Sequence, residues 1–104
     1  MIAMNHDQFH HYVNESGQYT LVTFSAPWCV YCRRIAPALE KVSQNHQNDL
    51  IVGKVDIDDE PVLAQQEGIE VIPTLILYKD GKALGSIVAP ESKAAIEAFL
   101  QEAK

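Results

Sequence analysis

The chain has 104 residues, of which 47% are hydrophobic, and it carries a formal net charge of −6. This length predicts one domain over residues 1–104, with enough apolar side chains to build a core. The acidic balance disfavours nucleic acid as a partner, and no basic amphipathic stretch or long apolar run predicts contact with a membrane.

The N-terminal residues 1–7 have neither the positive region nor the apolar run of a secretion signal. Two cysteines in a chain without such a signal favour a reducing compartment and a catalytic role for the pair. We therefore expect the protein to be cytoplasmic.

The first elements are predicted from capping signals. Residues 1–4 form a short apolar segment that indicates an edge strand, and Asn5 then has the features of a helix N-cap. Gln8 stands three residues later, as in a capping box. His6 and His10 lie four residues apart on this helix and could bind a metal ion. Exposed helix histidines are far commoner, so no metal site is predicted.

The rest of the chain alternates between apolar strands and amphipathic helices. We expect a strand at 19–25, a helix at 29–45, a strand at 50–57, a short helix between Pro61 and Gly68, a strand within 69–79, a hairpin turn at Asp80-Gly81, a strand at 85–88 and a final helix capped by Ser92. A strand, helix and strand in this order predict a parallel pair with a right-handed crossover. The predicted fold is α/β, in the order β-α-β-α-β-α-β-β-α, with helices on both faces of a mixed sheet.

Both cysteines lie where a predicted strand passes into a helix. The first N–H groups of a helix have no acceptor within the helix and carry a partial positive charge, which stabilises a thiolate. Cys29 at the helix start is therefore the expected nucleophile. Cys32, one turn further in, should be more buried and less ionised, which suits a resolving thiol. Arg33 and Arg34 add positive charge beside the pair.

Two other interpretations of the cysteine pair are weaker. The cysteines could be inert and buried, or they could form half of a zinc site. A structural zinc site needs four ligands, and the chain has no second cysteine pair and no histidine near the first in sequence. Redox chemistry is therefore favoured. It requires no bound cofactor, because the Cys29–Cys32 dithiol itself carries two electrons.

Several motifs together resemble the thioredoxin family over nearly the whole chain. They are Trp28-Cys29-x-x-Cys32, Pro37 within the second helix, Lys54-Val55-Asp56-Ile57-Asp58, Gly68-Ile69-x-x-Ile72-Pro73-Thr74 and Lys79-Asp80-Gly81. The resemblance implies a thioredoxin fold and a protein-disulfide reductase. A monomer is the expected state, since it is the default for a small disulfide carrier with one exposed patch. Its partners would be disulfide-containing proteins and a flavin-containing thioredoxin reductase or an equivalent electron donor.

The resemblance also implies roles for individual residues. Pro73 would be a cis-proline that faces the two cysteines and leaves the preceding backbone free to pair with an extended substrate. Trp28 would lie partly exposed beside the nucleophile, with its indole N–H held by Asp58. The implied substrate face is apolar and shallow. It consists of Trp28, Val30, Tyr31, Ile72, Pro73, Val88 and Ala89.

The chain departs from the family pattern at Thr23, where the family usually has a buried aspartate. That carboxylate is thought to take the proton of the second cysteine when the mixed disulfide resolves. Threonine cannot act as this base, so we expect slower resolution at neutral pH unless water or another group substitutes. Lys54, which matches a nearby family lysine, would also lose its partner.

Two further departures lie within the expected substrate face. Val30-Tyr31 replaces the usual Gly-Pro between the cysteines, and Ala89 replaces the glycine before the last helix. Arg33, Arg34 and the absence of the family aspartate are expected to raise the redox potential above that of ordinary thioredoxins, because stabilising a thiolate stabilises the reduced dithiol. The added methyl of Ala89 is expected to narrow the range of partners.

The sequence leaves two rival functions open. The same residues could serve a more oxidising protein, such as a disulfide oxidase, an isomerase or a dedicated redox relay. Alternatively, the chain could be a non-enzymatic binding protein that uses the fold as a docking surface, or two chains could share an iron–sulfur cluster through their cysteine pairs.

Overall fold

A computed structural model describes the whole chain, residues 1–104. Its elements are β1 (Ile2–Ala3), α1 (His6–Glu15), β2 (Tyr19–Ser25), α2 (Val30–Asn45), β3 (Leu50–Asp56), α3 (Pro61–Gln66), β4 (Thr74–Lys79), β5 (Lys82–Val88) and α4 (Lys93–Ala103). This order confirms the predicted sequence of strands and helices.

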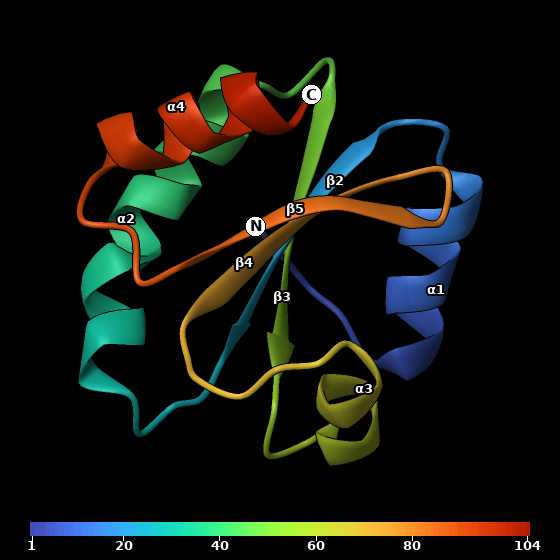
Figure 1. The fold of residues 1–104 in the computed structure, drawn as a ribbon, viewed down its shortest axis with the longest axis vertical. Coiled ribbons are helices and arrows are strands. Elements are labelled where there is room, and N and C mark those ends of the chain that lie inside the picture. Colours follow the sequence, from blue (N-terminus) through green and yellow to red (C-terminus); the bar gives the residue numbers. More distant parts are fainter.

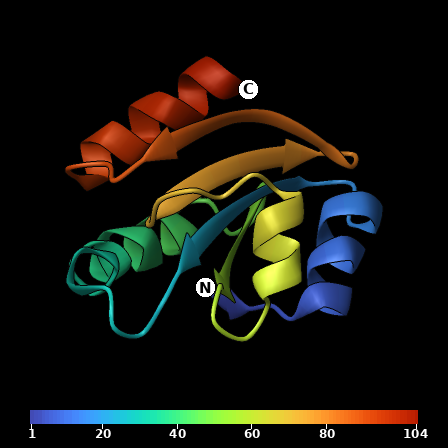
Figure 2. The ribbon, with the colours of Figure 1, turned by 60° about the horizontal axis from the view of Figure 1, so that its bottom comes forward.

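The five strands form one mixed sheet in the order β1-β3-β2-β4-β5. β3 pairs in parallel with β1 and β2, whereas β4 is antiparallel to both β2 and β5. Figure 1 shows α2 and α4 on one side of this sheet and α1 and α3 on the other. The predicted α/β class with helices on both faces is therefore confirmed. Figure 2 shows from another direction how the strands twist across the sheet.

The core is divided by the sheet into two clusters. Leu21 belongs to the cluster beneath α2 and α4, whereas Val22 and Phe24 belong to the cluster on the other face. Successive side chains of a strand point to opposite faces. Thr23 and Ser25 therefore share the face of Leu21, beneath α2. This two-sided burial explains why β2 is a continuous apolar run without clean alternation.

Local signals in the sequence act as predicted at the helix starts and at the hairpin. Asn5 Oδ1 accepts from the Gln8 N–H at 2.8 Å, and Gln8 Oε1 accepts from the Asn5 N–H at 2.9 Å, which completes a capping box. Asp80 and Gly81 have φ values of 51° and 83°. Positive φ at both central residues is what a two-residue type I′ hairpin turn requires.

Several boundaries differ from the sequence prediction or refine it. α2 begins at Val30 with Cys29 as its N-cap. β4 begins at Thr74, because Pro73 has no N–H to give to a strand ladder. β5 begins at Lys82 rather than residue 85, since the tight turn pairs Lys79 with Lys82 at once. None of the helices has both the length and the apolar character that crossing a bilayer demands.

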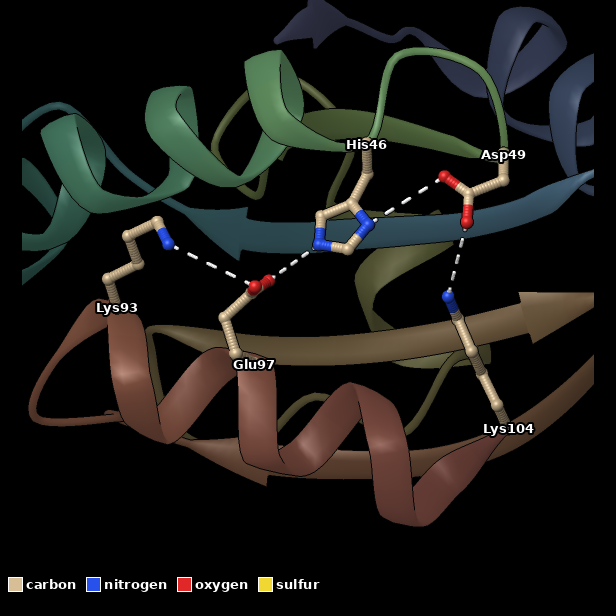
Figure 3. Close-up of polar contacts among 5 residues, drawn as sticks. All are labelled: His46, Asp49, Lys93, Glu97 and Lys104. Carbon is tan, nitrogen blue, oxygen red and sulfur yellow. Dashed lines mark hydrogen bonds and ion pairs between the residues drawn. The ribbon is translucent and has the colours of Figure 1, made fainter.

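A polar network joins the end of α2 to α4, as Figure 3 shows. His46 Nε2 lies 2.7 Å from Glu97 Oε1, and His46 Nδ1 lies 3.7 Å from Asp49 Oδ1. Lys93 Nζ lies 3.9 Å from the same Glu97 carboxylate, and Lys104 Nζ lies 3.8 Å from Asp49. These contacts fix α4 against the helix that carries the cysteines.

Candidate active site

Cys29 and Cys32 form a disulfide at the start of α2, with their Cα atoms 5.3 Å apart. Cys29 is the N-cap, and its Sγ accepts a hydrogen bond from the Cys32 N–H at 3.2 Å. This N–H is one of the donors that an α-helix cannot satisfy internally. Such a donor, together with the helix dipole, favours a negative charge on the Cys29 sulfur once the disulfide is reduced.

The expected difference in burial between the cysteines is absent. Both are 8% exposed, so the prediction that Cys32 is more buried was wrong for the disulfide form. The reason is that the disulfide holds both sulfur atoms together at the helix start. The two cysteines differ instead in their surroundings, because Cys32 lines a partly open cavity and Cys29 does not.

This cavity has a volume of about 200 Å³ and lies beneath the start of α2. Thr23, Lys54 and Asp56 contribute polar groups to its wall, and Arg33 borders it from α2. Thr23 pairs with Lys54 in the β2–β3 register, so both side chains lie on the sheet face that α2 covers. The cavity thus brings the resolving-cysteine candidate and the predicted supporting residues Thr23 and Lys54 together.

Asp56 is a cavity residue that the sequence reasoning did not single out. The available signal was its spacing, since Asp56 lies two residues after Lys54 on the same strand and therefore on the same face. In the sheet it pairs with Ser25, the last residue of the strand that leads to the cysteines. Its Oδ1 accepts from the Asp58 N–H at 2.8 Å, which fixes the carboxylate.

The predicted contact between Trp28 and Asp58 is confirmed. Trp28 Nε1 donates to Asp58 Oδ2 at 2.8 Å, while the indole ring remains 64% exposed beside Cys29. An exposed tryptophan held by a hydrogen bond provides apolar surface in a fixed orientation.

The Ile72–Pro73 bond is cis, as the resemblance implied. The Pro73 carbonyl accepts from the Ala89 N–H at 2.9 Å, so the proline loop and the loop before α4 lie side by side. Ala89 has a φ of 46°. A side chain in this left-handed region crowds the backbone, which is why glycine suits such a position best.

The predicted substrate face varies in exposure. Val30 and Val88 are 61% and 52% exposed, whereas Ile72 and Ala89 are half-buried and Pro73 is buried. Tyr31 is partly buried, because its hydroxyl donates to the Pro90 carbonyl at 3.0 Å. Tyr31 therefore ties α2 to the loop before α4, a contact that sequence reasoning missed.

One exposed residue of this region was also missed. Val71 is 53% exposed and directly precedes the Ile72–Pro73 pair. Its apolar side chain in a loop next to the predicted proline was the available signal.

The charged residues near the cysteines have different environments. Arg33 and Arg34 are both exposed, but only Arg33 borders the cavity. None of the ion pairs in the structure involves Lys54. On α1, the rings of His6 and His10 lie edge to face at 4.5 Å, and no group of three or more possible ligands surrounds them.

Comparison with known proteins identifies relatives along almost the entire chain. The thioredoxin family model matches residues 1–102. The thioredoxin of Buchnera aphidicola subsp. Acyrthosiphon pisum (strain APS) is 36% identical over 102 residues, which cover 98% of this chain and 94% of that protein.

Two other relatives agree with this match. Thioredoxin 1 of Synechococcus elongatus is 38% identical over 88% of this chain and 85% of its own length. The thioredoxin of Mycobacterium bovis is 42% identical over 81% of this chain and 72% of its own length. With its Cys29–Cys32 disulfide, the chain therefore belongs to the thioredoxin family of thiol–disulfide oxidoreductases.

Proposed function

We propose that this protein reduces disulfides in other proteins by cycling between a Cys29/Cys32 dithiol and a disulfide. The observation that carries the proposal is the different setting of the two sulfur atoms. Cys29 Sγ accepts a hydrogen bond from an N–H at the start of α2, whereas Cys32 lines a cavity that also includes the Asp56 carboxylate. These settings support a role for Cys29 as the attacking thiolate and for Cys32 as the thiol that releases its proton.

The proposed cycle has two exchange steps. The Cys29 thiolate attacks one sulfur of a substrate disulfide, forms a mixed disulfide and releases the other substrate sulfur as a thiolate. Cys32, as a thiolate, then attacks Cys29 Sγ and releases the second substrate sulfur. Two electrons pass to the substrate, and the protein is left as the Cys29–Cys32 disulfide. No bound cofactor is needed in this cycle.

Extended peptides are the substrates that the surface around Cys29 fits best. Trp28, Val30 and Val88 expose apolar side chains, and the backbone before Pro73 lies at a loop where an extended chain could pair. Such docking depends mainly on backbone hydrogen bonds and on the transient covalent bond, so it accepts many sequences. Exposed apolar groups gathered in this way are typical of binding surfaces.

The oxidised form has to be reduced again before another turnover. A flavin-containing thioredoxin reductase, or an equivalent donor, is the proposed source of electrons. We further propose that the protein works in the cytoplasm, because a reducing compartment keeps such a pair in its dithiol state. We also propose that it works as a monomer.

The proposal is tested by reduction of insulin disulfides with dithiothreitol as the electron source. The unaltered protein should accelerate the reduction, and Cys29→Ser should abolish the acceleration because the attacking sulfur is gone. Cys32→Ser that is first reduced and then freed of dithiothreitol should instead accumulate a covalent mixed disulfide with insulin, visible on a non-reducing gel. Full activity of Cys29→Ser, or no acceleration by the unaltered protein, would overturn the proposed function.

A further inference from the structure

The second exchange step requires a base near Cys32. A thiol is a poor nucleophile until it loses its proton, and Cys32 is only 8% exposed to bulk solvent. Thr23 is buried on β2 and also lines the cavity, but its neutral hydroxyl cannot hold the proton. The proton acceptor that we look for is therefore another group at the cavity that Cys32 lines.

Asp56 is the only carboxylate that lines the cavity beside Cys32. The other charged side chains at its wall are Lys54 and Arg33, which are hydrogen-bond donors at neutral pH. Met1 also borders the cavity, and its terminal ammonium lies 3.3 Å from a carboxylate oxygen of Glu40. Among these groups, the Asp56 carboxylate alone can accept a proton.

The strand register places Asp56 on the face of the sheet that α2 covers. It is the last residue of β3 and is in register with Ser25. The Asp58 N–H holds one of its oxygens at 2.8 Å, and Asp58 itself holds the indole of Trp28 at the same distance. A carboxylate accepts several hydrogen bonds, so Asp56 can bind a further donor from the cavity.

The cavity can hold the water that such a transfer needs. Its volume is about 200 Å³, well above the roughly 10–15 Å³ that one water molecule needs by the same measure. A buried water requires about two to four hydrogen-bond partners, and polar groups of Thr23, Lys54 and Asp56 can provide them. Asp56 also lines a second pocket, together with Asp59 and Glu60.

We propose that Asp56 accepts the proton of Cys32, through water in this cavity, when the mixed disulfide is resolved. The inference rests on the proposed function. The Cys32 S–H bond breaks and its proton passes to the Asp56 carboxylate, while the thiolate attacks Cys29 Sγ. The bond between Cys29 and the substrate sulfur breaks, and that sulfur leaves as a thiolate. The proton then returns from Asp56 to the leaving thiolate or to solvent.

The test follows both exchange steps with Ellman's reagent, 5,5′-dithiobis(2-nitrobenzoate), in a stopped-flow instrument. Reduced protein should release one thionitrobenzoate when Cys29 attacks and a second when Cys32 resolves the mixed disulfide. Asp56→Asn keeps the oxygen that accepts from the Asp58 N–H but removes the base. It should slow the second release by about tenfold or more at neutral pH, since general bases contribute about 10²–10⁴ and water can partly substitute.

Two control variants separate proton transfer from a structural effect. Asp59→Asn makes the same charge change three residues away, outside the cavity, and should leave both releases unchanged. Thr23→Asp combined with Asp56→Asn puts a carboxylate back at the cavity wall and should restore the second release. The defect of Asp56→Asn should also shrink as the pH rises, because hydroxide then deprotonates Cys32.

The outcomes distinguish this inference from the proposed function. If the unaltered protein gives no second release, the reductase cycle itself fails, and this inference fails with it. If both releases occur and Asp56→Asn changes neither, or slows both equally, only the role of Asp56 is overturned. Asp56→Asn could also abolish the second release in a way that neither Thr23→Asp nor high pH restores. This result would overturn the role of Asp56 as a base and indicate a structural role.

Discussion

Thr23 shows how one substitution can move a chemical task to another residue. It is 3% exposed and lies on the face of β2 that α2 covers, where a carboxylate would be next to the resolving cysteine. Its hydroxyl suits a buried position on a strand, but it cannot accept and hold the proton of a thiol. The neighbouring strand supplies Asp56 to the same cavity, so the fold provides a base by a different route.

Ala89 adopts a backbone conformation that is less favourable for alanine than for glycine. Its φ of 46° lies in the left-handed region, which is unfavourable for a side chain by about 1–2 kcal/mol. The hydrogen bond from its N–H to the Pro73 carbonyl holds it there. Because Ala89 belongs to the proposed substrate face, we expect its methyl group to limit how closely a partner can approach.

Tyr78 makes stability depend on pH in the alkaline range. Burial, then the hydrogen bond to Glu67 and the charge of Glu67, raise the pKa of Tyr78 far above its ordinary value of 10.0. Above that pH the unfolded chain loses the tyrosine proton while the folded protein keeps it. The free energy of unfolding should therefore fall as pH rises past about 10, by up to about 1.4 kcal/mol per pH unit.

Tyr78→Phe isolates this effect. Urea unfolding of both proteins between neutral and alkaline pH should give a shallower alkaline decline for the variant, because it has no phenol to titrate at this site. The other tyrosines and the lysines are the same in both proteins, so their contributions cancel. Equal slopes in the two proteins would contradict the raised pKa of Tyr78.

At the scale of elements, the contact between His46 and Glu97 should stabilise the packing of α4 on α2. The two groups lie 2.7 Å apart, with side chains 25% and 34% exposed. A carboxylate can only accept, so the histidine ring donates this hydrogen bond. A double-mutant cycle with His46→Gln and Glu97→Gln should give a coupling energy of about 0.5–1 kcal/mol from urea unfolding.

The pair of His11 and Glu15 is a matched control for this cycle. It has the same 2.7 Å distance, but it lies within α1 and its side chains are 64% and 68% exposed. Solvent screens exposed pairs, so its coupling energy should be smaller. Equal coupling energies for the two pairs would show that the link between α2 and α4 adds nothing beyond a surface contact.

Elements whose signals are local were predictable from the sequence. The capping box at Asn5 and the Asp80-Gly81 turn depend on residues a few positions apart, and both form as expected. The sequence located β4 only within residues 69–79, because the point where strand pairing begins depends on distant partners that a local pattern does not specify. The place of the cysteine pair at the start of α2 was likewise readable from the strand before it.

The parts of the site that sequence reasoning missed arise from tertiary contacts. Asp56 reaches the cavity only because β3 pairs with β2 in a particular register. The bond from Tyr31 to the Pro90 carbonyl joins residues 59 positions apart. Cys29 and Cys32 are equally exposed because of their disulfide and the side chains around it. The helix pattern in the sequence does not reveal these contacts.

Over the whole molecule, a net charge of −6 contrasts with the two arginines that follow the cysteines. Their positive charges favour the Cys29 thiolate and hence the reduced form, which makes the disulfide more oxidising. Both arginines are exposed, so salt and water screen this effect. We therefore expect a redox potential raised only modestly above about −270 mV, the value typical of thioredoxin.

The central claim is that this protein donates electrons to the disulfides of other proteins. The measurement that tests it most directly is the redox potential of the Cys29–Cys32 pair, by equilibration against glutathione buffers. The account predicts a value between about −270 and −200 mV, which is reducing enough to open protein disulfides. A value at or above about −180 mV, the potential of protein disulfide isomerase, would contradict it and indicate an isomerase or an oxidant.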